Sequence, residues 1–277
     1  MKKYYLFIAL VMVAAMTVSC KNNNKKAAKT AEANAEVVEA AKTILADDVL
    51  ATIDELVQAY INADGGEIAY EEIIASSLTE EEKLIKPDYL LEASRANEMV
   101  TKSQKLNTLA ILLVERPIRI AYGMPTEGTD EVIAHFIADV NSPVNLDGNK
   151  DLTLSEKLKK AYEFYKERGD VADFWQSYGL ASVTELGYLI SKNTDAFFRN
   201  INEDQYAAFL KRVTAVANAV RFLSEYDPEV KQAWDAFNAG GEVATDIDLS
   251  QETIEHAKIF FSEREEIFAA RRANLLK

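Results

Sequence analysis

Oxygen-bearing side chains alternate along residues 145–156, in the order Asn-Leu-Asp-Gly-Asn-Lys-Asp-Leu-Thr-Leu-Ser-Glu. Calcium takes roughly six to eight oxygen ligands, and a single glutamate can supply two of them. The side chains that could supply such oxygens are those of Asn145, Asp147, Asn149, Asp151, Thr153 and Glu156. This spacing predicts a calcium site in the segment.

The same segment resembles the calcium loop of the EF-hand family, because oxygen-bearing residues stand at its first, third, fifth and ninth positions and a glutamate at its twelfth. It departs from that loop at its first position, where Asn145 replaces an aspartate, and at its sixth, where Lys150 replaces a glycine. The resemblance implies calcium bound by the six side chains named above. An alternative interpretation needs no ion, because Thr153 and Glu156 stand at the spacing of a capping box that would begin the next helix.

The two histidines offer another possible metal site. Glu131, His135 and Asp139 follow one another at steps of four, so on a helix they share one face and could hold an ion. Glu252 and His256 repeat the first of these steps. The alternative is that both histidines belong to ordinary solvated helix faces, where charged pairs at this spacing are common.

Aromatic side chains gather in residues 162–178, as Tyr162, Phe164, Tyr165, Phe174, Trp175 and Tyr178. They could form an exposed platform for a sugar or a protein partner, or they could fill a helical core, which is the commoner place for such stripes. The chain shows no Gly-rich phosphate loop, nucleophile elbow or zinc ligand set. The sequence therefore names no catalytic residue and gives no positive sign of an enzyme.

The amino-terminal residues predict export and a lipid anchor. Lys2 and Lys3 precede an apolar stretch over 4–16, which is shorter than the roughly 20 residues of a transmembrane helix and typical of a signal peptide. The stretch ends in Thr17-Val18-Ser19-Cys20, which resembles the lipobox of bacterial lipoproteins and contains the only cysteine of the chain. The resemblance implies a signal peptide over 1–19 and Cys20 as the site of lipid attachment, where two or more acyl chains give firm membrane binding. An ordinary secretory signal is the alternative.

Residues 20–36 have almost no large apolar side chain, so we expect a disordered tether behind the anchor. The tether is basic, which suits either an anionic membrane surface or a simple soluble spacer. No acidic residue directly follows Cys20, and this favours an outer-membrane anchor that faces the periplasm. The whole chain has a net charge of -14. Binding to nucleic acid is therefore not expected, since it requires clustered Lys and Arg.

Apolar residues recur at steps of three and four through residues 37–277, and no segment alternates with a period of two. This pattern predicts an all-α domain of about ten helices, either one bundle or two packed halves that meet near 141–153, with a linker-like segment at 240–249. We expect capping boxes at Thr79 with Glu82, Ser182 with Glu185, and Asn202 with Gln205, and a helix that begins at Pro228. Further expected helices are a central buried one within 88–122, one over 130–140 capped by Thr129, short ones over 170–178 and 182–192, and a last one capped by Ser250.

These features predict a membrane-tethered envelope lipoprotein that acts as a non-enzymatic module and binds a protein or a glycan. The alternative is a calcium-stabilised or other metal-binding helical protein.

Overall fold

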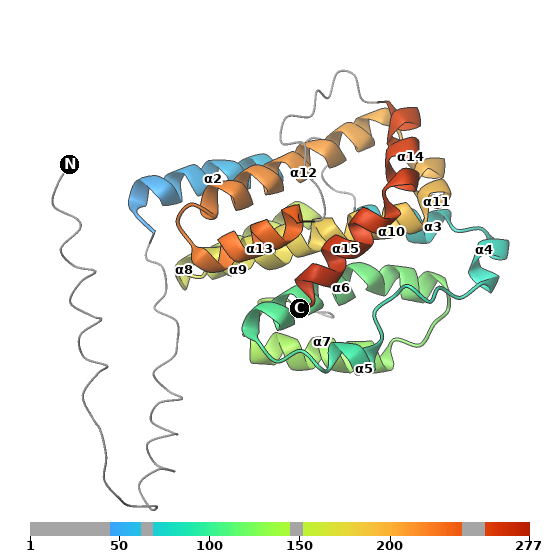
Figure 1. Ribbon diagram of the computed structural model, residues 1–277, viewed down its shortest axis with the longest axis horizontal. Helices are drawn as coiled ribbons and strands as arrows, with labels where there is room; N and C mark the ends of the chain where they lie inside the picture. Colours follow the sequence, from blue (N-terminus) through green and yellow to red (C-terminus); the bar gives the residue numbers. More distant parts are fainter. Residues whose placement is uncertain (1–44, 62–68, 145–151, 240–252) are drawn as a thin grey trace, which may run out of the picture. The chain divides into compact units, whose positions relative to one another are not determined.

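The structure is a computed structural model that describes residues 45–61, 69–144, 152–239 and 253–277. Throughout these ranges the regular elements are helices and no strand occurs, so the predicted all-α fold is confirmed (Figure 1). All of the described residues belong to one compact unit, residues 43–277. The predicted signal peptide, Cys20 and the tether lie outside the described residues, as does the segment 240–249.

The helices of the described ranges are α2 (Asp47–Ile61), α3 (Tyr70–Ser77), α4 (Glu80–Leu84), α5 (Ala93–Ala96), α6 (Lys102–Ala121), α7 (Glu127–Asp139), α8 (Leu154–Glu167), α9 (Val171–Phe174), the π-helix η2 (Trp175–Ala181), α10 (Ser182–Lys192), α11 (Thr194–Asn200), α12 (Glu203–Leu223), α13 (Pro228–Asn238), α14 (Ile254–Glu263) and α15 (Glu265–Leu275). None of them combines the length and the apolar character that crossing a bilayer would require.

Three clusters of buried apolar side chains form the core. The first joins α2, α8, η2, α12 and α13, the second joins α3, α10, α11, α14 and α15, and the third lies between α5, α6 and α7. Helix α6 contributes to all three, with Ala110 in the first, Ile118 in the second and Ile111 in the third. The prediction of a central buried helix is therefore confirmed for α6, and α12 similarly connects the first two clusters.

Several of the predicted helix ends are confirmed. Capping boxes begin α4, α8 and α12, at Thr79 with Glu82, Thr153 with Glu156, and Asn202 with Gln205. In each, the N-cap side chain accepts a bond from the third helical N–H and the third side chain accepts one from the N-cap N–H. Helix α13 begins at Pro228 as predicted, with the Asp227 carboxylate accepting from the N–H groups of Glu229 and Val230.

Three predicted helices were wrong in extent. The first was to run from residue 88 to residue 122, but α6 begins only after Thr101, which caps it. Residues 88–92 do not form a helix, and the Leu91 N–H there donates to the buried Glu115 carboxylate, at 2.8 Å from Oε1. Helix α7 begins after Thr126 rather than Thr129. The last predicted helix is two helices, α14 with Thr253 as its N-cap and α15, which separate at Arg264.

The predicted break between residues 178 and 182 was also wrong. Helices α9, η2 and α10 follow one another without interruption from Val171 to Lys192. Ser182 does not cap a helix, because its hydroxyl donates to the Ser177 carbonyl at 2.9 Å, while Glu185 accepts from the Arg272 guanidinium at 2.6 Å. The capping spacing was present in the sequence, but both side chains bind other partners in the fold.

Candidate functional site

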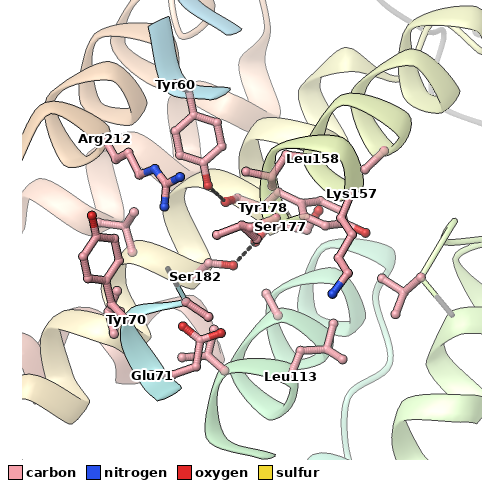
Figure 2. A pocket seen from close by; sticks show the side chains of 18 of the residues that line it. Tyr60, Tyr70, Glu71, Leu113, Lys157, Leu158, Ser177, Tyr178, Ser182 and Arg212 are labelled. Atoms are coloured by element: carbon pink, nitrogen blue, oxygen red, sulfur yellow. Dashed lines mark hydrogen bonds between the residues drawn. The ribbon is translucent and has the colours of Figure 1, made fainter. Parts of the chain in front are cut away.

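A cavity of about 640 Å³ lies between α2, α3, α6, α8, η2, α10 and α12 (Figure 2). Most of its wall is apolar, with side chains that include Leu113, Val114, Leu158, Val183 and Val213. Its volume falls in the range of pockets that hold small organic ligands, which combine an apolar wall with a few polar groups. This cavity is the candidate ligand site of the described residues.

The π-helix η2 shapes one wall of the cavity. A π-helix has a wider turn than an α-helix, and single π turns occur frequently at functional sites. Ser177 and Tyr178 on η2 and Ser182 at the start of α10 all line the cavity. The Tyr60 hydroxyl of α2 crosses to this wall and donates to the Tyr178 carbonyl at 2.9 Å (Figure 2). This bond connects α2 to η2 where the regular helical bonding pattern is interrupted.

Charged residues of four helices, α3, α6, α8 and α12, line the cavity. Arg212 of α12 is only 5% exposed, and its guanidinium lies 5.7 Å from the centre of the Tyr70 ring. Figure 2 shows the Arg212 guanidinium and the Glu71 carboxylate directed into the same space from α12 and α3, with Lys157 extending toward it from α8. The described wall therefore combines an apolar surface with four cations and two carboxylates, which are Arg116, Lys157, Lys160, Arg212, Glu71 and Glu72.

The environment of Glu71 disfavours its charged form. Burial among the surrounding helices raises the pKa of this carboxyl to about 7, an effect that the neighbouring Glu72 carboxylate reinforces and that Arg212 and Lys157 oppose. Burial similarly raises the pKa of Tyr60 to about 12. At neutral pH Glu71 therefore exists in both protonation states, whereas the Tyr60 hydroxyl stays a hydrogen-bond donor.

The predicted calcium site is described only at its carboxyl-terminal end. The Glu156 carboxylate accepts a hydrogen bond from the Thr153 N–H at 2.8 Å, and the Glu156 N–H donates to the Thr153 hydroxyl at 3.2 Å. These are the bonds of the capping box that the alternative interpretation requires. The other four predicted ligands, Asn145, Asp147, Asn149 and Asp151, lie outside the described residues, so calcium binding stays a prediction.

The histidines are not gathered into a metal site. The His135 side chain is 60% exposed, and its Nε2 lies 3.4 Å from the Asp139 carboxylate, which also pairs with Lys105. In the described ranges, no three His, Cys, Asp or Glu side chains come together as ligands of one ion. His256 is exposed near the start of α14, and Glu252 lies outside the described residues. The exposure of His135 favours the interpretation of a solvated surface residue.

The aromatic residues of 162–178 form core rather than an exposed platform. Phe174 and Trp175 are fully buried, and Tyr162 and Tyr165 nearly so, in the first apolar cluster. Tyr178 is half-buried, stacks on Phe174 at 5.5 Å between ring centres, and has part of its side chain on the cavity wall. The interpretation of these stripes as core is confirmed, and Tyr178 is the member of the group that reaches the candidate site.

Sequence reasoning did not identify Glu71, Lys157 or Arg212. Arg212 shares a helix face with Phe209 and Val216, three residues before and four residues after it. A cation among apolar side chains at this spacing was a usable signal, because a buried arginine requires a specific reason. Glu71 and Lys157 occupy positions typical of ordinary helix faces and carry no such signal.

No protein-family model matches the chain, and no curated protein or solved structure matches it either. The proposals below are therefore argued from the residues of this chain.

Proposed function

We propose that this chain is a membrane-tethered, non-enzymatic binding protein of the bacterial cell envelope, and that its ligand site is the cavity between α3, α6, α8 and α12. The observation that carries the binding role is the cavity itself, which has the size of a small-molecule pocket and a mostly apolar wall. The tether is the lipobox-like segment that ends in Cys20.

The wall of the cavity favours a small molecule with an apolar body over the protein or glycan partner expected from sequence. A glycan needs many hydrogen-bonding groups around its hydroxyls, whereas here apolar side chains such as Leu113, Val183 and Leu158 make most of the contact surface. A protein partner would need a broad exposed surface rather than a half-open pocket of this size. A small amphipathic ligand satisfies both the apolar wall and the few charged groups.

Binding is tested with N-phenyl-1-naphthylamine, a neutral dye that fluoresces when it leaves water. The full chain carrying Cys20→Ser is used, so that no acyl chain of its own competes for the cavity. We expect saturable binding of one dye per chain, which Leu113→Trp abolishes by filling the cavity. The matched control is Ile120→Trp on the same helix, at a position that is 53% exposed and away from the cavity. Dye binding that both variants retain would contradict the assignment of the site.

The tether is tested separately by fractionation. We expect the parent chain to sediment with membranes and the Cys20→Ser chain to become soluble, because the acyl chains expected on Cys20 supply the membrane affinity. Sedimentation of the Cys20→Ser chain with membranes at the parental level would disprove a lipid anchor at this residue. The result is independent of whether the cavity binds the dye.

A further inference from the structure

Three hydroxyl groups of the cavity wall direct their hydrogens into the fold. The Tyr60 hydroxyl donates to the Tyr178 carbonyl at 2.9 Å, and the Ser182 hydroxyl donates to the Ser177 carbonyl at 2.9 Å. The Ser177 hydroxyl in turn donates to the Asp173 carbonyl at 2.6 Å. A hydroxyl group has one hydrogen and two lone pairs, so these three groups can offer a ligand only hydrogen-bond acceptors.

Glu71 adds a further acceptor to the cavity. Figure 2 shows the Ser182 hydroxyl between the Tyr60 hydroxyl and the Glu71 carboxylate in this view, and the three residues come from three different helices of the wall. A carboxyl group keeps an acceptor oxygen in either of its protonation states. This set of polar groups therefore matches a ligand that donates a hydrogen bond.

The cations of the wall do not require a charged ligand. Arg116 donates to Asp130 at 2.8 and 3.1 Å, and Arg212 has a further interaction partner within the chain. Lys157 and Lys160 are exposed to solvent on α8. Their charges are thus compensated by the fold or by water, whereas an ammonium ligand would still meet four positive side chains. A neutral head group suits this wall better than either an anion or a cation.

We propose that the cavity binds a neutral amphiphile with a hydrogen-bond donor, such as a hydroxyl group, at its head. The head lies against the hydroxyl oxygens of Tyr60 and Ser182, and the apolar body lies along Leu113 and Leu158. This inference rests on the proposed function and specifies its ligand class. A head group that only accepts, such as an ether, would meet lone pairs at these hydroxyls and would lose its hydrogen bonds to water without replacement.

The test displaces N-phenyl-1-naphthylamine from the full Cys20→Ser chain with 1-octanol or heptyl methyl ether at neutral pH. These competitors are isomers with the same numbers of carbon and oxygen atoms, and only the alcohol has a donor. We expect 1-octanol to displace the dye at a concentration about three- to tenfold lower than the ether, which is the usual net effect of one hydrogen bond. Octanoate and octylamine, which are both charged at this pH, should be weaker competitors than 1-octanol.

Two substitutions assign the preference to named hydroxyl groups. Ser182→Ala should weaken 1-octanol about threefold and leave heptyl methyl ether unchanged. The matched control is Ser191→Ala on the same helix, α10, because the Ser191 hydroxyl also donates to a backbone carbonyl, that of Tyr188 at 2.7 Å, but lies away from the cavity. This control should change neither competitor. Tyr60→Phe removes the other hydroxyl and keeps the ring, so it provides the same test even if Ser182→Ala does not fold.

The outcomes separate this inference from the proposed function. Dye binding with the ether equal to 1-octanol, or with octanoate or octylamine the best competitor, would overturn the ligand class and leave the binding role intact. An unchanged preference for 1-octanol in both the Ser182→Ala and the Tyr60→Phe chain would overturn the placement of the head group. No dye binding to a chain that is folded by circular dichroism would overturn the inference and the proposed function together.

Discussion

At the scale of single residues, Glu71 is the titratable group whose surroundings make folding stability depend on pH near neutrality. Its pKa is raised from 4.5 to about 7 because surrounding protein replaces water around it. The folded chain therefore holds this proton at pH values where the unfolded chain has released it. Glu71 thus lowers the free energy of unfolding as the pH rises from 4.5 to about 7, and the loss is complete above that range.

Glu71→Gln removes this ionisation while it keeps the shape of the side chain. We expect the variant to be more stable than the parent at pH 8, by up to about 3 kcal/mol, and equal to it below pH 4.5, as urea denaturation at both pH values would show. Glu72→Gln is the comparison. Glu72 is exposed on the same helix and only reinforces the raised pKa of Glu71, so its replacement should reduce the pH dependence slightly without removing it. A Glu71→Gln variant that is less stable at pH 8 would mean that the charged form makes a favourable contact.

Thr153 and Glu156 provide a test between the two interpretations of the segment 145–156. The hydrogen bond from the Thr153 N–H lowers the pKa of Glu156, as expected for a carboxylate that accepts a backbone donor. We predict that Thr153→Ala lowers the free energy of unfolding by about 1 kcal/mol, the usual value of an N-cap, with or without calcium. Thermal denaturation in EDTA and in millimolar calcium would measure both. A rise in melting temperature with calcium that Asp147→Ala removes would instead establish an ion site.

At the scale of helices, the predictions that succeeded depend on residues close together in sequence. The capping box of Asn202 with Gln205 and the turn before Pro228 use only local bonds, so their residue types suffice to predict them. The helix predicted from residue 88 failed at its start, where the Leu91 N–H donates to the buried carboxylate of Glu115 on α6. The local preference of these residues for a helix competes there with a buried hydrogen bond, and the hydrogen bond determines the backbone conformation.

The candidate site shows the same dependence on contacts between distant segments. Glu71, Lys157 and Arg212 come from three helices that are far apart in sequence, and only Arg212 carries a signal on its own helix. The cavity also depends on η2, whose π-helical turn no periodic pattern indicates. The all-α fold could therefore be predicted from the sequence, whereas the site could not, because it consists of the space that the packed helices leave.

At Gly187, α10 is in close contact with the Phe268 side chain of α15. A Cβ atom built there would lie 2.6 Å from the ring of Phe268, which is buried between the two helices. We predict that Gly187→Ala destabilises the chain by about 1 to 3 kcal/mol, the usual cost of overpacking, although alanine is the better helix former. Urea denaturation of the variant measures the change.

Gly128 on α7 is the matched control for this substitution. An added Cβ would there meet Ala93 at 3.5 Å, which is ordinary van der Waals contact. Gly128→Ala should therefore be neutral or slightly stabilising. If Gly187→Ala were also neutral or stabilising, α10 and α15 would not be in close contact at this position.

At the scale of the whole molecule, one buried arginine connects the carboxyl-terminal helix to the centre of the fold. Arg272 of α15 donates to Glu185 of α10 at 2.6 Å and pairs with Glu115 of α6, while Arg119 lies 3.4 Å from the same Glu115 carboxylate. Both carboxylates are fully buried. Burial raises the pKa of each, and the positive charge of Arg272 opposes this rise. The network thus holds three separate helices together through charges that compensate one another.

Replacing Arg272 leaves two carboxylates buried with less compensating charge. We predict that Arg272→Met lowers the free energy of unfolding by about 3 to 5 kcal/mol at pH 7, the usual cost of breaking a buried ion pair from one side. Without Arg272 the pKa values of Glu115 and Glu185 rise further, so these groups are protonated more readily in the folded chain than in the unfolded one. The deficit should therefore shrink as the pH falls toward 5, as urea denaturation at several pH values would show.

Lys192→Met provides the comparison, because Lys192 also connects α10 to α15, through Glu265, but at the surface. Its partner side chain is 45% exposed, so the loss should be below about 1 kcal/mol. The double variant Arg272→Met with Glu185→Leu should recover part of the stability lost by Arg272→Met alone, since it removes one of the two uncompensated charges. If Arg272→Met and Lys192→Met had equal and small effects, α15 would be held by its apolar contacts alone, and the buried charges would contribute little to the position of this helix.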